Sequence, residues 1–320
     1  MTKDRISTFP WCLFLFILFG SNYLNANEFS DIQPLAKHSL LLDIDTQQGL
    51  TVAVGERGHI LYSTNYKDWV QASVPTHQLL TAVYLQDSQT GWAVGHHGLI
   101  LKTTDGAKNW RQVAYTQDEA PLLDIIFINS TTGFAVGAYG AFYITHDAGE
   151  TWNKKYFNDS LDFDFHLNAI AAIDKNRLYI VGESGHIFRS DNAGESWQLL
   201  SSPYDGSFFG VLPVSYDELY VFGLRGNLYK SHDAGLVWEK VNTETNALLS
   251  GAIQLKEKSI IVTSLADKFF VKHSKRNDFI DLTSPGRDAI TSLVNIGELL
   301  ILVGKTGIHY LQIKNFESSE

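Results

Sequence analysis

Residues 91–110, GWAVGHHGLILKTTDGAKNW, contain the pattern that decides the fold. A short apolar run ends in glycine and is followed by a glycine-framed turn, an alternating segment, an Asp-containing turn and a tryptophan. Related runs recur and end at Gly55, Gly95, Gly137, Gly182, Gly223 and Gly304. The successive steps are 40, 42, 45, 41 and 81 residues, and the last step equals two periods. This self-similarity indicates a repeat protein.

A column of aromatic residues follows the same period. It consists of Trp69, Trp110, Trp152, Trp197, Trp238 and Phe279, spaced by 41, 42, 45, 41 and 41 residues. The glycine column lacks its sixth member, because Ser264 stands where the glycine is expected in the run 260–264. With that copy included, the chain contains seven units.

Each unit contains four strand-like pieces. In the second unit they cover residues 79–85, 91–95, 99–103 and 110–113, separated by turn residues. Four antiparallel strands that repeat every 40 to 45 residues are typical of a propeller blade. The sequence therefore predicts an all-β, seven-bladed β-propeller of four-stranded antiparallel blades. Because the last unit ends without its aromatic strand, residues 29–34 are predicted to form the outer strand of the last blade and to close the ring.

The N-terminus has the features of a secretory signal. Lys3 and Arg5 precede a nine-residue apolar run, residues 11–19, which is too short to cross a bilayer. Cleavage is predicted after Ala26, so residues 1–26 are interpreted as a signal peptide and residues 27–320 as a single propeller domain; an uncleaved anchor is the alternative. The only cysteine, Cys12, lies inside the apolar run, so the mature chain has no thiol. The predicted location is the periplasm.

The turn between the third and fourth strands carries an Asp-box. In this turn an Asp or Asn accepts backbone hydrogen bonds, a glycine supplies a positive φ, and the following tryptophan is buried between blades. We predict a structural role, because these residues lie in separate blades and cannot converge on one ligand. The assigned residues are Asp105, Asp147, Gly149, Trp152, Asn192, Gly194, Trp197, Asp233, Gly235 and Trp238.

The units resemble the Asp-box (BNR) repeats of bacterial propellers, and across nearly the whole mature chain they are most similar to the photosystem II stability/assembly factor family. The stretch from Gly91 to Trp110 carries this resemblance best. It implies a non-catalytic scaffold for membrane-protein assembly, and it also implies a non-photosynthetic branch linked to envelope exporters of the resistance–nodulation–division type. Photosynthetic members have an arginine-rich face, whereas Arg57 and Arg225 are the only arginines in the turns between second and third strands here.

Those turns form one predicted face, whose residues vary within a constant glycine frame, as expected of a recognition surface. The long connection 156–166 mixes phenylalanines with aspartates, and exposed aromatic residues in a loop favour contact with a partner, although they could also pack onto the blade edge. The candidate partner-binding residues are Arg57, His96, His97, Tyr139, Phe163, Phe165 and Arg225.

Composition and motifs limit the other functions. A net charge of −10 argues against nucleic acid as a partner. Adjacent histidines on a hairpin usually point apart and no third ligand is evident, so no metal or cofactor is predicted at His96 and His97. No catalytic residue is assigned and the predicted protein is not an enzyme; it binds a membrane or envelope protein, takes no small-molecule substrate and is monomeric on its own. The alternative is a sialidase-like glycosidase or a passive carbohydrate-binding propeller.

Overall fold

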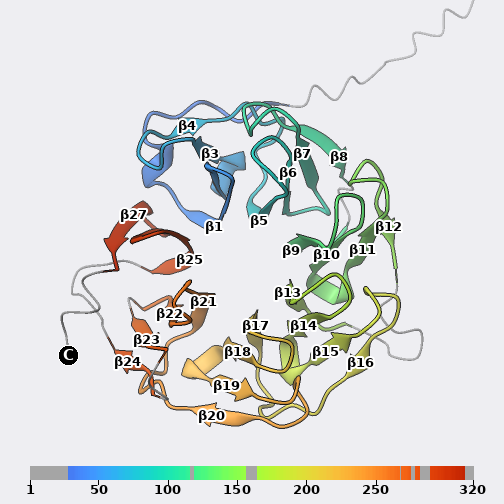
Figure 1. Cartoon of the computed structure of the whole chain (residues 1–320). Coiled ribbons are helices and arrows are strands. Elements are labelled where there is room, and N and C mark those ends of the chain that lie inside the picture. Colours follow the sequence, from blue (N-terminus) through green and yellow to red (C-terminus); the bar gives the residue numbers. More distant parts are fainter. Residues whose placement is uncertain are drawn as a thin grey trace, which may run out of the picture.

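The computed structural model describes residues 28–115, 119–155, 164–266, 268–274, 278–281 and 289–313. These residues form seven small antiparallel sheets around a central opening (Figure 1). In every sheet the strands follow chain order from the inner to the outer edge. Six blades have four strands, and three strands are described in the seventh. The predicted seven-bladed propeller is confirmed.

The strands of the first four blades match the repeat pattern closely. They are β1 (Leu41–Gln47), β2 (Leu50–Gly55), β3 (Ile60–Ser63) and β4 (Val70–Gln71); β5 (Leu80–Leu85), β6 (Gly91–Gly95), β7 (Ile100–Thr103) and β8 (Arg111–Ala114); β9 (Leu122–Phe127), β10 (Gly133–Gly137), β11 (Phe142–Thr145) and β12 (Asn153–Lys154); and β13 (Leu167–Ala172), β14 (Leu178–Gly182), β15 (Ile187–Ser190) and β16 (Gln198–Leu199).

The remaining blades follow the same plan. Their strands are β17 (Phe208–Pro213), β18 (Leu219–Gly223), β19 (Leu228–Ser231) and β20 (Glu239–Val241); β21 (Leu249–Gln254), β22 (Ile260–Ser264), β23 (Phe269–Lys272) and β24 (Ile280–Asp281); and β25 (Ile290–Ile296), β26 (Leu299–Gly304) and β27 (Gly307–Gln312). The described helices are single 3-10 turns: η1 (Ala36–His38), η2 (Glu56–Gly58), η3 (Ala138–Gly140), η4 (Glu183–Gly185) and η5 (Leu224–Gly226). None of the described helices is both long and apolar enough to span a membrane.

The apolar core is divided among the gaps between blades. Each of the seven clusters of buried side chains in the described residues combines two neighbouring blades. The aromatic residue before each outer strand packs into the cluster shared with the preceding blade; Trp110, for example, joins the cluster of blades one and two. The repeated aromatic column therefore holds adjacent blades together through buried apolar surface.

The prediction for ring closure is not confirmed. Residues 29–34 form no strand, and they lie beside the first blade instead of the last. The Ser30 N–H donates to the Val74 carbonyl (2.8 Å), and the Gln33 N–H donates to Oε1 of Gln71 in β4 (2.8 Å). The first and last blades meet through side-by-side inner strands, β1 and β25, and through a shared apolar cluster that includes buried Ala36 of η1. The first and last blades are therefore joined by packing between their inner strands, and not by the predicted outer strand from the N-terminus.

Each inner strand contains a β-bulge directly after its first residue. At this point the register with the second strand shifts by one residue in all seven sheets. A bulge leaves one residue unpaired and changes the direction of its side chain. We call these residues the bulge ring: Leu42, Thr81, Leu123, Asn168, Phe209, Ser250 and Thr291.

The turns between the third and fourth strands have the hydrogen bonds expected of an Asp-box. In the third blade, Oδ1 of Asp147 accepts the Thr151 N–H (2.9 Å) and the Thr145 hydroxyl (2.8 Å), and the Gly149 N–H donates to that hydroxyl oxygen. Equivalent acceptors stand at Asp105, Asn192 and Asp233. Every partner is local, and Gly149, Gly194 and Gly235 all have positive φ angles.

Candidate functional site

The turns between second and third strands and the connections between blades lie on one face of the ring, which we call the turn face. The first residue of each turn donates its N–H to a carbonyl of the connection that enters the same blade; the donors are Glu56, His96, Ala138, Glu183, Leu224, Leu265 and Lys305. The glycine before the turn is needed for this close approach, because a Cβ at Gly137 would lie 2.1 Å from the Pro121 carbonyl oxygen. The turn face is therefore a rigid frame.

The second residue of these turns has a left-handed backbone. The φ angles are 56° at Arg57, 60° at His97, 52° at Tyr139, 52° at Ser184 and 56° at Arg225. A positive φ is uncommon for residues other than glycine. Here it directs five variable side chains, including four predicted partner-binding residues, outward from the frame. Tyr139 is 65% exposed, which is unusual for a large aromatic side chain.

Blades two to four carry three neighbouring groups of imidazole and aromatic rings on the turn face. His97 lies edge-on to Tyr115, with ring centroids 6.2 Å apart, and 6.5 Å from His96. Tyr139 lies edge-on to His166 at 4.9 Å, and Phe165 lies 4.6 Å from His186. We call this set the histidine–aromatic strip: Tyr115, His96, His97, Tyr139, Phe165, His166 and His186.

Backbone hydrogen bonds fix the middle of the strip. The Gly140 N–H donates to the Phe165 carbonyl (2.8 Å), so the end of the long connection is tied to the Tyr139 turn. The His166 N–H donates to Oε2 of Glu183 (3.0 Å), and the Glu183 N–H donates to the His166 carbonyl. These bonds tie the turn that carries Tyr139 to the connection that carries Phe165.

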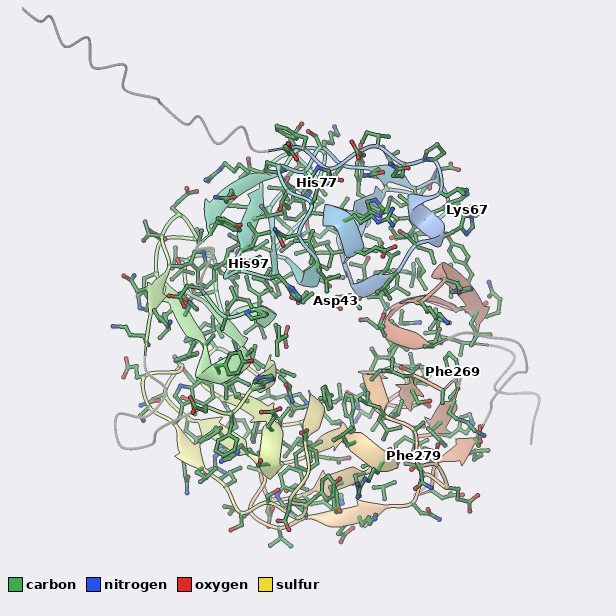
Figure 2. All side chains as sticks on the ribbon, turned by 180° about the vertical axis from the view of Figure 1, so that it is seen from behind. Asp43, Lys67, His77, His97, Phe269 and Phe279 are labelled. Atoms are coloured by element: carbon green, nitrogen blue, oxygen red, sulfur yellow. The ribbon has the colours of Figure 1, made fainter. Side chains whose placement is uncertain are left out.

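A pocket of about 470 Å³ opens within the strip. It is lined by His96, His97, Glu119, Ala120, Pro121, Tyr139, Ala141 and Lys154. His97 also lies on the second blade in the side-chain view of Figure 2. The pocket brings together three residues that were predicted separately from the sequence, and its size is within the range of side-chain and small-ligand sites.

The charges of this pocket are largely neutralised. Lys154 donates to Oε2 of Glu119 at 2.5 Å and lowers the pKa of that carboxyl, which also accepts the Tyr143 hydroxyl (3.2 Å). Burial and the neighbouring Glu119 raise the pKa of Tyr143 to about 12. Burial, followed by His97, lowers the pKa of His96, which favours the neutral form of this imidazole. The pocket therefore offers rings and one internal ion pair.

The two predicted arginines do not join the strip. Arg57 lies on the first blade and Arg225 on the fifth, so three intervening blades separate them along one side of the ring and two along the other. Phe163 lies outside the described residues. The structure thus brings His96, His97, Tyr139 and Phe165 to one region and places both arginines elsewhere on the turn face.

Three carboxyl groups stand on inner strands beside the central opening, where Asp43 is labelled in Figure 2. Oδ2 of Asp43, Asp45 and Asp124 accepts an N–H from the inner strand of the following blade: Val83, Leu85 and Ile170, respectively. Loss of hydration raises all three pKa values, to about 7 for Asp45 and Asp124. Because both oxygens of Asp45 and of Asp124 already accept backbone N–H groups, these carboxyls act as links between blades.

Sequence reasoning missed several members of the strip. Tyr115, His166 and His186 lie outside the glycine-framed turns; Tyr115 directly follows β8, and His166 and His186 directly precede β13 and β15, so the ends of these strands place all three on the turn face. His166 was within the long connection, but nothing in its spacing indicated contact with Tyr139. In the described part of the chain, no three His, Cys, Asp or Glu side chains are placed to hold a metal ion.

Fold and site together define a seven-bladed propeller whose rigid turn face carries exposed side chains. The family model of the photosynthesis system II assembly factor YCF48 matches residues 108–292, so the chain belongs to this family. Two curated relatives, the photosystem II assembly lipoproteins Ycf48 of Trichormus variabilis and of Nostoc sp., are each 34% identical over 58 residues. That match covers 18% of this chain and 17% of each relative.

Solved structures share the fold over most of the chain. YCF48 from Cyanidioschyzon merolae has a TM-score of 0.71 at 13% identity, covering 88% of this chain and 97% of that one. A YCF48 bound to a D1 peptide has a TM-score of 0.70 at 14% identity, covering 88% and 98%. The GH74 enzyme of Niastella koreensis has a TM-score of 0.70 at 15% identity, covering 89% of this chain and 54% of the enzyme. At these identities the similarity concerns the fold.

Proposed function

We propose that this protein is an exported, non-enzymatic scaffold that binds a polypeptide segment of a membrane or envelope protein through the histidine–aromatic strip. The carrying observation is the arrangement of Tyr139 and Phe165, which are exposed yet fixed by backbone hydrogen bonds on adjacent blades. Aromatic residues on a rigid support bind partners at a small entropic cost.

Membership of the YCF48 family supports this proposal, because one structure with the same fold is a YCF48 bound to a D1 peptide. The arrangement of arginines here makes a photosystem subunit a poor match. An envelope protein, in the first instance an exporter of the resistance–nodulation–division type, is the proposed partner. We further propose that residues 1–26 act as a cleaved signal, that the propeller lies in the periplasm and that it is a monomer without its partner.

A site-specific cross-linking experiment tests the strip. A photoreactive benzoylphenylalanine is placed at Tyr139 of the full chain, and irradiated envelope extracts are searched for covalent adducts. The control carries the same group at Val237, which is also 65% exposed but lies in an Asp-box turn on the opposite face. We expect a distinct adduct from position 139 that disappears in the His97→Asn/Phe165→Ala background. Equal adducts from both positions, or none from position 139, would contradict the proposal.

Because a GH74 enzyme shares the fold, glycosidase activity is the second function to test, on the same purified protein. The purified chain is incubated with sialyl, xyloglucan and peptidoglycan substrates. We expect no release of reducing sugar or sialic acid above the level of an Asp43→Asn/Asp124→Asn variant. Turnover that depends on these carboxyls would replace the scaffold proposal with hydrolysis.

A further inference from the structure

The seventh blade ends in a strand whose outer side is open. Among the described residues, β27 is the outermost strand of this blade, whereas each of the other six blades has a fourth strand outside its third (Figure 1). The Ile313 N–H donates to the Glu298 carbonyl beside β26, so the alternate residues of β27 direct their backbone groups away from the sheet. We call Ile308, Tyr310 and Gln312 the open edge.

The other blades show what covers the equivalent edge. Ile308 has the same register position as Ile60 of blade one, since each pairs with the valine directly before the turn glycine. The Ile60 carbonyl accepts the N–H of Ala72, just after β4 (2.8 Å), and the carbonyls of Phe142 and Ile187 accept equivalent bonds in blades three and four. No outer strand within the described part of the chain supplies such a donor to Ile308. Its outward carbonyl and the outward N–H groups of the edge are available for pairing.

The side chains of the open edge are less covered than their counterparts. Tyr310 is 44% exposed, whereas the residues at its register position in the other six blades are buried or half-buried. These counterparts are Tyr62, Lys102, Ile144, Arg189, Lys230 and Val271. Ile308 is half-buried, while Ile60 and Ile187 at the same position are buried. The fourth strand accounts for this difference in cover.

The gap between blades six and seven also differs from the other six gaps. In each of those gaps, the aromatic residue that precedes an outer strand packs against the apolar cluster. These residues are Trp69, Trp110, Trp152, Trp197, Trp238 and Phe279. As far as the structure describes the chain, the cluster of blades six and seven has no aromatic residue from that position, and its members at the outer edge of blade seven are Leu311 and the partly buried Ile313. An aromatic ring beside these two residues would complete the seventh gap.

The N-terminal segment that matches an outer strand lies beside another blade. The Ser30 N–H donates to the Val74 carbonyl, and Gln33 bonds to Gln71 of β4. Phe29, which matches the aromatic column in pattern, is 56% exposed. The segment therefore contributes neither the strand nor the aromatic ring to blade seven.

We propose that blade seven binds an extended segment of the partner protein, which pairs with β27 as an antiparallel fourth strand. The register of blade one gives the order of contacts. An aromatic residue of the segment packs beside Leu311 and Ile313, the next two residues lie opposite Tyr310 and His309, and the N–H of the residue after them donates to the Ile308 carbonyl. Addition of a strand to an open sheet edge is a recurring mode of peptide recognition.

This proposal shares one premise with the proposed function, because it takes the partner to be a polypeptide. It adds a second contact, at the outer edge of blade seven, and a sequence rule for the partner. The rule is an aromatic residue followed by at least three residues able to form a strand, as in the six outer strands of this chain.

A peptide that copies one of these outer strands tests the proposal. The probe is a fluorescent peptide of residues 193–204, which contains the tryptophan and the outer strand of blade four. We expect it to bind the full chain in an anisotropy titration. Replacement of its tryptophan by alanine should weaken binding at least tenfold, because the ring that fills the gap is lost. Equal binding of the two peptides would overturn the proposal.

Two substitutions at position 310 separate strand pairing from side-chain contact. Tyr310→Pro removes an outward N–H from the edge, and proline is tolerated in edge strands where the N–H faces solvent. Tyr310→Phe keeps that N–H and removes only the hydroxyl that accepts Nε1 of Trp69 (2.7 Å). We expect the proline variant to bind the peptide at least tenfold more weakly and the phenylalanine variant to bind it as the wild type does. Thermal melting shows whether both variants are folded.

Hydrogen exchange of the wild type gives a readout that needs no variant. The Tyr310 amide should exchange rapidly in the chain alone and at least tenfold more slowly with the peptide, while the Tyr62 amide, which faces β4, should be slow in both. Protection of Tyr310 without peptide would overturn the proposal; if that protection rises with protein concentration, the edge pairs with a second copy of this chain. If cross-linking at position 139 succeeds while the peptide does not bind, only the edge proposal fails. If the peptide protects Tyr310 but no adduct forms, only the strip proposal fails.

Discussion

The Thr291 hydroxyl of the last blade donates a 2.8 Å hydrogen bond to the Leu41 carbonyl of the first blade. The neighbouring Ser292 hydroxyl donates to Oδ1 of Asp43 at 2.8 Å. Residues about 250 positions apart thus repeat the contacts that join blades adjacent in the chain. The ring is closed by the same kind of bulge-residue hydrogen bond that joins blades two and three, four and five, and six and seven.

Closure should depend on η1 more than on the segment before it. Ala36 is buried between the last and first blades, and a Cβ at Gly307 would meet the Lys37 carbonyl, whereas residues 28–33 are exposed except for Ser30. Ala36→Asp is therefore expected to lower the melting temperature strongly, and deletion of residues 28–33 only slightly. Calorimetry of both variants checks this. A larger loss from the deletion would restore a closing role for the terminal segment.

A buried lysine links blades two and three. Lys102, whose side chain is 6% exposed, donates to Glu150 (2.7 Å) and to the Ala148 carbonyl, while the exposed Arg111 reaches the same carboxylate. We expect Glu150→Gln to reduce the free energy of unfolding by about 1–3 kcal/mol, because it leaves a buried charge without its counterion. Arg111→Ala should cost less than about 1 kcal/mol. Urea denaturation of both variants measures the difference, and a reversed order would contradict the burial argument.

The buried carboxyls of Asp45 and Asp124 should make the protein less stable as the pH rises. The pKa of Asp45 and of Asp124 is about 7 in the folded state, against 3.8 without the fold, so the folded state binds more protons between these values. Unfolding free energy should fall as the pH rises from about 4 to 7, by at most about 4 kcal/mol per carboxyl. Asp45→Asn/Asp124→Asn should flatten this slope, and Asp205→Asn should not. An unchanged slope would show that both carboxyls titrate normally.

The Asp-box turns should tolerate an amide in place of the acid. Asn192 accepts the Ser196 N–H at 2.9 Å, as Asp147 accepts the Thr151 N–H at the same distance. Asp147→Asn is therefore expected to melt within a few degrees of the wild type, while Asp147→Ala removes the acceptor and should melt lower. Differential scanning fluorimetry compares the two. Added Ca²⁺ should shift neither melting temperature, since local donors already occupy the acceptor.

The repeated columns in the sequence were sufficient to predict the blades, because each column corresponds to one physical requirement. The glycines let each turn approach the connection that enters the same blade, and the aromatic residues fill the gaps between blades. The closing contacts could not be predicted in the same way. Phe29 and Ile32 match the pattern of an outer strand, yet both side chains are exposed. The backbone N–H of Ser30, which would have paired in the last blade, donates instead to a carbonyl beside the first blade.

The candidate site was only partly visible for a related reason. His97 and Tyr139 occupy a repeat position, so alignment of the units identified them. His166 and His186 reach the same surface through turns and connections whose geometry depends on neighbouring blades. The bulge ring was missed because a bulge is a property of pairing between strands, and residues such as Thr81 and Phe209 share no side-chain character that a sequence pattern could detect.

The bulge positions separate the lining of the central opening from the packing between blades. Leu42, Leu123 and Phe209 are the apolar bulge residues that line the pocket at the end of the central opening, while the residues before them remain buried between blades. A substitution at one of these three positions changes the lining of the opening and leaves the adjoining apolar clusters intact. Descendants of one ancestral ring could therefore acquire different partners by single substitutions, each with little loss of stability.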